Sequence, residues 1–342
     1  MARLPGAAAP TAARVSLLTA RQPPCSLTKG TDPMTTSALA FWKGSARALA
    51  ATGLLCAALT GTTAHASGQG TAAAQPFTGP ALFDDFNYTG YRDPQIPQHG
   101  WTLKSGQGGP GVPGAGWRPQ NVTFATEAGN SVMTLRSGTN GTRAGTEQTE
   151  IYHQRKFQYG TYAARVRFSD APVSGPDGDH MVQTFFTISP LDFPMDPNYS
   201  ELDFEYLPNG GWSVPSSALL ATSWETYQED PWQAVNITTQ QRASFAGWHN
   251  LVITVDAEHI TYYVDGRLFA THPEPYVPET TMTLRFDHWL IDLLGTNSRR
   301  PRSYEEKVDY VYFLKDQVLT PAQVQGAVTD YRTRGVTFED SV

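Results

Sequence analysis

Three acidic side chains alternate with apolar ones in the segment Glu201-Leu202-Asp203-Phe204-Glu205. Alternation with a period of two is typical of a β-strand, and it places the acidic side chains on one face and the apolar ones on the other. Neighbouring carboxylates on one strand face repel one another, so the pattern favours a site in which they bind a metal ion or carry out acid–base chemistry. A solvated acidic strand face is the alternative.

Paired carboxyl groups are what the hydrolysis of a glycosidic bond requires. A retaining glycosidase uses one carboxylate as the nucleophile and one carboxylic acid to protonate the leaving oxygen, and the two groups lie about 5–5.5 Å apart. On a flat strand, positions i and i+4 are roughly 13 Å apart. Glu201 and Glu205 can therefore act as a pair only if the sheet is bent and concave towards them. Asp203, between them, could share a proton with one of them.

The order of segments around this motif resembles family 16 of the glycoside hydrolases, especially bacterial endo-β-1,3-1,4-glucanases and laminarinases. The mark of that family is Glu-x-Asp-x-Glu preceded by a Tyr-Gly strand, and Tyr159-Gly160 opens such a strand in this chain. The resemblance covers about residues 80–315. Its further segments, in order, are residues 183–187, 248–249, 260–266, 287–289 and 307–311.

The resemblance implies an all-β fold, a concanavalin-like β-jelly-roll sandwich of two antiparallel sheets with a concave substrate cleft. It also implies that Glu201 is the nucleophile, that Glu205 is the general acid and base, and that Asp203 tunes their protonation. We therefore expect a retaining endo-glycosidase that hydrolyses a β-linked polysaccharide. A β-1,3- or mixed-linkage β-1,3-1,4-glucan is the first choice, and galactan, agar-type and xyloglucan-type polymers are alternatives.

Further residues are candidates for binding the sugar, because flat aromatic rings stack on the C–H faces of sugars. Trp289, Asp287 and Arg285 share one strand face by the period of two. The resemblance implies a sugar platform at Trp289 and hydrogen bonds to sugar hydroxyls at Asp287, which stands where the family usually has Asn and could pair with Arg285. Trp224, on the strand after the acidic motif, and Trp212, beside a pair of glycines, are two more candidates.

The predicted reaction needs no cofactor, but the resemblance suggests a structural calcium ion. The family often holds one on its convex side through an Asp of the closing strand and backbone carbonyls, and Asp309 matches that Asp. Two other functions stay open. A carbohydrate-binding sandwich without hydrolysis would not need both Glu201 and Glu205, and a structural or adhesion module could hold calcium on the three acidic side chains of the motif.

From Leu82 onwards, short runs rich in Val, Ile, Thr, Tyr and Phe alternate with Gly, Pro and Asn turns, which predicts a sandwich or a barrel of β-strands. Clear strands and one hairpin with an Asp-Gly turn are expected over residues 132–136, 162–168, 251–255 and 260–269. The one convincing helix begins at the N-cap Thr320 with Pro321 in its first turn, and Gly335 is placed to end it. We expect this helix to pack on the outer surface.

The first 66 residues have the pattern of a leader. Met34, a candidate for the true start, opens a stretch with basic residues, an apolar run over residues 48–59 and the cleavage pattern Ala64-His65-Ala66. This is the pattern of a secretory signal peptide, and its apolar run is too short to span a bilayer. We therefore expect a secreted, extracellular protein. A flexible lead-in and a single catalytic domain follow, over residues 67–80 and 81–342.

Composition limits the partners of the mature chain. Of the 25 Lys and Arg residues six precede position 67, and of the 32 Asp and Glu residues one does, so 19 basic and 31 acidic residues give a net charge of −12. This acidic balance argues against nucleic acid and anionic membranes as partners. Cys25 and Cys56 both lie in the leader, and a domain of this length can fold without disulfides. We expect a monomer whose partner is its polysaccharide substrate.

Overall fold

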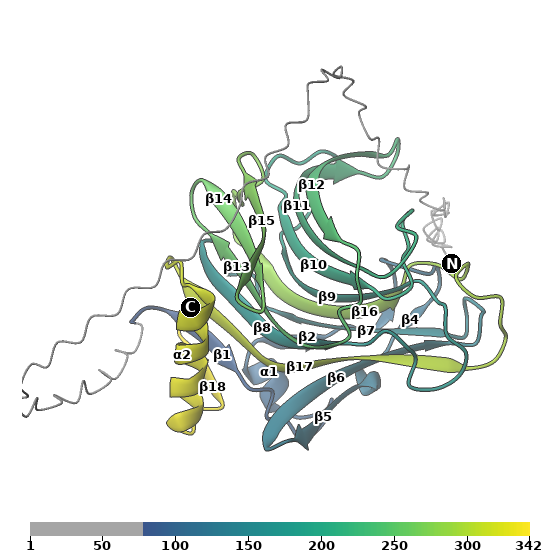
Figure 1. Ribbon diagram of the computed structural model, residues 1–342, viewed down its shortest axis with the longest axis horizontal. Coiled ribbons are helices and arrows are strands. Elements are labelled where there is room, and N and C mark those ends of the chain that lie inside the picture. The colour runs from purple at the N-terminus through teal and green to yellow at the C-terminus, as the bar shows by residue number, and fades with distance from the viewer. Residues whose placement is uncertain (1–77) are drawn as a thin grey trace, which may run out of the picture. The chain divides into compact units, whose positions relative to one another are not determined.

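Two antiparallel β-sheets pack face to face in the computed structural model of the protein, which describes residues 78–342 (Figure 1). The inner sheet has the spatial order β12, β11, β10, β9, β16, β7 and β2, and it curves with its concave face turned away from the outer sheet. Its strands are β2 (Trp101–Leu103), β7 (Thr146–His153), β9 (Met181–Ile188), β10 (Glu201–Leu207), β11 (Ala218–Gln228), β12 (Gln233–Gln241) and β16 (Thr283–Leu290).

The outer sheet is built around its longest strand, β17. One edge of β17 pairs with β8, which continues to β13, β14 and β15, and the other edge pairs with β6 and β1. The strands are β1 (Ala81–Asp84), β5 (Val122–Glu127), β6 (Asn130–Thr139), β8 (Gly160–Phe168), β13 (Gly247–Val255), β14 (His259–Val264), β15 (Arg267–Pro273), β17 (Arg302–Lys315) and β18 (Phe338–Asp340). This arrangement is the predicted jelly-roll sandwich.

Smaller elements complete the described chain. Two short strands, β3 and β4, lie at the edge of the sheets, and β4 pairs with β7 in parallel orientation. The remaining elements are β3 (Gly106–Gln107), β4 (Gly116–Trp117), α1 (Gln95–Gln98), the 3-10 turn η1 (Pro119–Asn121) and α2 (Pro321–Thr333).

The strands expected from the sequence are present. Residues 132–136, 162–168 and 251–255 lie within β6, β8 and β13. The hairpin of β14 and β15 turns at Asp265 and Gly266, which both have positive φ angles, of 50° and 77°. Two positive φ angles define a type I′ turn, the geometry that an Asp-Gly pair favours.

Alternate residues of β10 fill the space between the two sheets. Leu202, Phe204 and Tyr206 are fully buried in the main hydrophobic core. The ring of Phe204 meets Tyr262 of the outer sheet edge-on, with centroids 5.2 Å apart, and the ring of Tyr206 meets Phe168 at 5.1 Å. Because these three side chains are anchored in the core, the other face of β10 must point to the concave side.

The predicted C-terminal helix is α2, and it packs on the outer sheet as expected (Figure 1). Thr320 caps it, because its hydroxyl accepts a hydrogen bond from the backbone N–H of Gln323, while Oε1 of Gln323 accepts one from the backbone N–H of Thr320. Tyr331 stacks on Phe83 of β1 with ring centroids 4.6 Å apart. Apolar contact with the outer sheet therefore holds the helix.

An arginine of α2 joins the helix to the outer sheet by charge. Arg332 donates to Asp309 of β17 at 2.9 Å (Nη2 to Oδ1) and to Asp85 at 3.1 Å (Nε to Oδ1). The other oxygen of Asp309 accepts from Arg165 at 2.8 Å. Both oxygens of Asp309 thus face guanidinium groups, and residues 78–342 contain no cluster of three or more acidic, His or Cys side chains suited to a metal ion. Two guanidinium groups at one carboxylate do not fit a cation bound to Asp309. A calcium ion elsewhere on the convex side stays a prediction.

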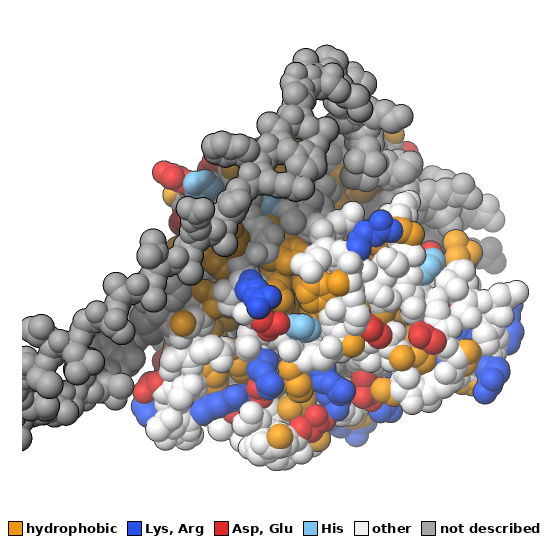
Figure 2. Space-filling model, viewed as in Figure 1, with side chains coloured by type: hydrophobic (Ala, Val, Ile, Leu, Met, Phe, Trp, Pro, Cys, Tyr) orange, Lys and Arg blue, Asp and Glu red, His pale blue; other side chains and the backbone are white. Residues whose placement is uncertain are grey.

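Charges of both signs are interspersed on the face seen in Figure 2. On the outer sheet, acidic and basic side chains of different strands form ion pairs. Arg136 of β6 donates to Glu305 of β17 at 2.9 Å, and Lys307 of β17 pairs with Glu127 of β5. Such exposed pairs contribute little to stability.

The predicted signal peptide, residues 1–66, and most of the predicted lead-in lie outside the described residues. Within residues 78–342, no helix is long and apolar enough to cross a membrane.

We expect Arg332→Met to lower the free energy of unfolding by about 2–3 kcal/mol, because Asp85 and Asp309 would lose charged hydrogen bonds in a largely buried position. Urea unfolding at neutral pH measures this change. Arg334→Met is the matched control on the same helix, since Arg334 pairs with Asp330 at 2.8 Å in an exposed position and its loss should cost less than about 0.5 kcal/mol. Equal decreases in the free energy of unfolding for the two variants would contradict a larger contribution from the ion pairs of Arg332.

Candidate active site

Glu201, Asp203 and Glu205 lie side by side on the concave face of β10. Because their apolar neighbours on β10 are held in the core, the alternation of the strand decides where the carboxyl groups point. Asp203 is 3% exposed, whereas Glu201 and Glu205 are half-buried. The structure thus brings together the three acidic residues that the sequence pattern selected.

Strands β9 and β11 hold β10 in register from both sides. Glu201 is paired with Ile188 of β9 and Trp224 of β11, and Glu205 is paired with Thr184 of β9. A slip of one residue would turn all the carboxyl groups into the apolar core. The two ladders therefore fix which side chains surround each carboxyl group.

The carboxyl group of Glu201 has the partners that stabilise a negative charge. Burial raises its pKa to about 7, while a hydrogen bond from the hydroxyl of Tyr199 and the positive charge of Arg285 act in the opposite direction. Asp203 also hydrogen-bonds to Glu201 and lowers its pKa. Sequence reasoning missed Tyr199, although its position two residues before Glu201 puts it on the same strand face.

The surroundings of Glu205 and Asp203 favour the protonated carboxyl group more strongly than those of Glu201 do. Burial, followed by the negative charges of Glu201 and Asp287, raises the pKa of Glu205 to about 8, and no hydrogen bond from the described residues counteracts this. Burial and the charges of both glutamates raise the pKa of Asp203 well above its usual range. Asp203 accepts a hydrogen bond from the indole of Trp224 at 3.1 Å. Burial and the neighbouring negative charges therefore favour the protonated form of Asp203.

Two basic side chains share a buried carboxylate on the same concave face. Arg285 of β16 donates to Glu150 of β7 at 2.6 Å (Nη1 to Oε1), and Lys104 donates to its other oxygen at 2.5 Å. Glu150 is 2% exposed, and a charge buried to this extent needs such partners. Sequence reasoning missed Glu150 and Lys104. The alternation within β7 is a local signal for Glu150, but Lys104 follows the end of β2 and has none.

Asp287 and Trp289, both on β16, form a polar and aromatic pair beside the acidic row. The indole of Trp289 donates to Oδ1 of Asp287 at 3.0 Å, and the hydroxyl of Thr184 donates to the same oxygen at 2.6 Å. The suggested pairing of Asp287 with Arg285 is wrong, because the guanidinium group binds Glu150 instead.

Aromatic side chains gather at both ends of the acidic row. Near Glu201, one cluster centres on Tyr227, whose ring centroid lies 5.2 Å from that of Tyr199 and 5.9 Å from those of Trp224 and Trp232. Beyond Glu205, a second cluster contains Trp212, Trp289 and Trp117. Trp117 is buried in this second cluster, and the ammonium group of Lys104 lies 4.0 Å from its ring centroid.

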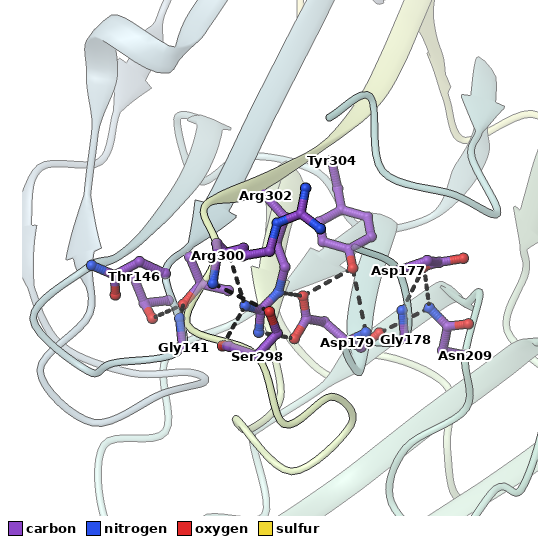
Figure 3. A network of polar contacts seen from close by, with 12 residues as sticks. Gly141, Thr146, Asp177, Gly178, Asp179, Asn209, Ser298, Arg300, Arg302 and Tyr304 are labelled. Atoms are coloured by element: carbon purple, nitrogen blue, oxygen red, sulfur yellow. Dashed lines mark hydrogen bonds and ion pairs between the residues drawn. The ribbon is translucent and has the colours of Figure 1, made fainter. Parts of the chain in front are cut away.

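A buried ion pair fixes the loops beside the second aromatic cluster (Figure 3). Arg302 donates to Asp179 at 2.6 Å (Nη2 to Oδ1), and the hydroxyl of Tyr304 donates to Asp179 at 2.9 Å. Asn209 donates to Asp177 at 3.0 Å and to the backbone carbonyl of Asp179 at 3.1 Å. The network ties the loop before β9 and the loop after β10 to the first residues of β17.

Comparison with known families identifies a match over much of the chain. Residues 115–312 match the family model described as glycosyl hydrolases family 16, and this stretch is more than half of the 342 residues. A search of curated proteins finds no match to this sequence.

Solved structures with similar folds include two glucan-related proteins. A β-glucanase of Bacillus licheniformis is 19% identical, with a TM-score of 0.50, and the similarity covers 70% of this chain and 100% of that one. A family 16 protein of a Bacteroides ovatus mixed-linkage glucan locus, solved with a product, is 13% identical with a TM-score of 0.51, over 68% of this chain and 99% of that one. At these identities the likeness concerns the fold.

We expect Tyr199→Phe to raise the pKa of the Glu201 carboxyl by about one further pH unit, because the phenol donates a hydrogen bond that favours the ionised form. NMR titration of ¹³C-labelled glutamate carboxyl carbons measures this pKa. Tyr227→Phe is the control: its ring contacts Tyr199, but no hydrogen bond joins its hydroxyl to Glu201 within the described part of the chain. If both variants leave the pKa unchanged, the hydrogen bond from Tyr199 does not tune Glu201.

Proposed function

The chain belongs to family 16 of the glycosyl hydrolases, and we propose that its substrate is a β-1,3-glucan or a mixed-linkage β-1,3-1,4-glucan. Membership of this retaining family makes it an endo-glycosidase that acts on a β-linked polysaccharide. The proposal concerns the identity of that polysaccharide and the residues that cleave it.

The difference in hydrogen bonding between the two glutamates of β10 supports a division of roles. Glu201 accepts a hydrogen bond from Tyr199, and the positive charge of Arg285 lies near it. Both interactions stabilise the ionised form of Glu201 against the effect of burial. Among residues 78–342 Glu205 has neither kind of partner, and burial together with the neighbouring negative charges favours its protonated form. Environments that push two carboxyl groups apart in this way assign the base and the acid. Glu201 is therefore the nucleophile, and Glu205 is the general acid and base.

The reaction then takes two steps. An oxygen of the Glu201 carboxylate forms a bond to the anomeric carbon while the bond from that carbon to the leaving sugar oxygen breaks, and the proton of Glu205 moves to this oxygen. In the second step, the ionised Glu205 takes a proton from water, the water oxygen bonds to the anomeric carbon, and the bond to Glu201 breaks. Both carboxyl groups return to their initial state, and the configuration at the anomeric carbon is retained.

Asp203 acts between the two glutamates without touching the anomeric carbon. Because burial and the charges of both glutamates favour its protonated form, it can donate a hydrogen bond to Glu201. That bond stabilises the carboxylate before attack. The indole of Trp224 holds the other side of Asp203. Asp203 is therefore a positioning and charge-tuning residue.

Aromatic side chains at both ends of the acidic row support a polymeric substrate. The half-buried rings of the two clusters, Trp224 at one end and Trp212 at the other, offer stacking surfaces for sugar units on either side of the cleaved bond. Trp289, Asp287, Arg285, Trp224 and Trp212 are the proposed substrate-binding residues. The preference for glucan rests on the resemblance of the sequence to glucanases and on the glucan-related names of two proteins that share the fold.

We propose that the protein acts outside the cell after loss of residues 1–66, as a monomer, and that hydrolysis itself requires no cofactor.

Reducing-sugar release from a panel of polysaccharides tests the substrate. We expect release from β-1,3-glucan or mixed-linkage glucan, and losses of about 10²–10⁴-fold in kcat for Glu201→Gln and Glu205→Gln, since each removes a group that reacts. Glu258→Gln, in an exposed turn, is the control and should keep full activity. Release only from galactan, agar or xyloglucan would replace the proposed substrate, and glycan binding without release would make the chain a carbohydrate-binding sandwich.

The pH profile tests the assignment of the acid and the nucleophile. Activity needs ionised Glu201, whose pKa is raised to about 7, so it should fall as the pH drops below that value. It also needs protonated Glu205, whose pKa is raised to about 8, so it should fall as the pH rises above that value. We therefore expect a bell-shaped profile of kcat/KM with its maximum between about pH 7 and 8. An acidic optimum near pH 4 would contradict the assignment.

A further inference from the structure

The pairing between β9 and β16 is interrupted beside Glu205. The two strands pair as far as Arg285 of β16 and resume pairing, in the same register, at His288. The two positions between them do not pair, and the gap on β9 includes Thr184, the partner of Glu205 in the neighbouring ladder. In a regular antiparallel ladder, one of two such successive pairs would exchange both of its backbone hydrogen bonds.

Side chains make the hydrogen bonds that the open ladder lacks. The backbone N–H of Asp287 donates to the hydroxyl of Thr184 at 2.8 Å, and this hydroxyl donates to Oδ1 of Asp287 at 2.6 Å. The backbone N–H of Thr184 donates instead to Oε2 of Glu306 at 3.2 Å. Glu306 belongs to β17 of the outer sheet, so this hydrogen bond crosses the interior of the sandwich.

Glu306 is an unusual group between two sheets. It is fully buried, and within residues 78–342 its other oxygen, Oε1, has no hydrogen-bond partner. Burial, followed by the negative charge of Asp287, raises the pKa of Glu306 well above its usual range. Burying a carboxyl group costs free energy that an apolar side chain would not. Its one described hydrogen bond goes to the opened ladder, which indicates a role there.

We propose that Glu306 is a positioning residue of the active site, which keeps the ladder between β9 and β16 open so that Thr184 can hold Asp287 beside Glu205. This inference rests on the proposed roles of Glu205 and Asp287. While the N–H of Thr184 is bonded to Glu306, it cannot return to β16, and the hydroxyl of Thr184 stays bonded to Asp287. If the ladder closed, backbone bonds would replace these side-chain bonds and Asp287 would leave its place.

The position of Asp287 matters for two reasons. Its negative charge is among the causes that raise the pKa of Glu205, so it favours the protonated acid. Its Oδ1 also accepts the hydrogen bond from Trp289, one of the proposed substrate-binding rings. Glu306 would therefore act on the reaction through Asp287, without contact with the substrate.

The test compares two substitutions of Glu306. Glu306→Met offers no acceptor to the amide of Thr184, whereas Glu306→Gln keeps one. We expect the Met variant to lower kcat/KM about tenfold, as for the loss of one hydrogen bond that holds an active-site group, and the Gln variant to retain most of the activity. Glu305→Gln is the matched control on β17, because Glu305 pairs with Arg136 at the surface, and it should leave kcat/KM unchanged.

A second background separates positioning from a general loss of structure. In Asp287→Ala, the group that Glu306 positions is gone, so adding Glu306→Met should change kcat/KM less than twofold. An equal loss in the Asp287→Ala background and in the wild type would overturn the proposal, as would unchanged activity of folded Glu306→Met. If Glu306→Met does not fold, Thr184→Ser and Thr184→Val make the same comparison, and equal activity of those two would overturn it.

A crystal structure of Glu306→Met distinguishes this inference from the proposed function. We expect the amide of Thr184 to bond to the backbone of Asp287, and the carboxyl group of Asp287 to move away from Glu205. A wild-type protein that is inactive on every polysaccharide would refute the proposed function. An Asp287 carboxyl group that stays in place in the variant would refute only the role of Glu306.

Discussion

The alternation of side chains along β10 ties the active site to the hydrophobic core. Leu202, Phe204 and Tyr206 are fully buried between the two sheets, and the residues between them are the carboxyl groups of the site. Repulsion among these groups opposes their burial side by side, but a slip of one residue would expose the apolar side chains and turn all three acids into the core. Apolar packing on one face of the strand therefore holds an unfavourable arrangement of charges on the other.

Burial gives the site its acid–base character, and local partners then make the carboxyl groups different from one another. Desolvation raises the pKa of Glu201, Asp203 and Glu205 alike. Tyr199 and Arg285 oppose this effect at Glu201, whereas no side chain of the described part of the chain does so at Glu205. These different surroundings are what support the proposed roles of Glu201 as nucleophile and Glu205 as acid. This principle explains why the neighbouring strands matter as much as the motif itself.

Buried ion pairs and hydrogen bonds away from the acidic row hold the surrounding loops and strands in place. The pair of Arg302 and Asp179 fixes loops beside the aromatic cluster, and Arg332 fastens the C-terminal helix to the outer sheet. Glu306 reaches across the core to an opening in the inner sheet. Each of these groups is buried or largely buried, so each needs its partner to avoid a large desolvation penalty, and such a requirement specifies one arrangement of loops and strands.

The sequence by itself determined the features that depend on short-range periodicity. These include the strand with Glu201 and Glu205, the hairpin around Asp265 and the capped helix after Thr320, because side-chain alternation and turn preferences are local properties. Only the tertiary structure decided that Arg285 binds Glu150, that Arg332 meets Asp309, and that Glu306 bonds to Thr184. These partners are far apart in the chain, and strand register and sheet packing bring them together, which no local pattern encodes.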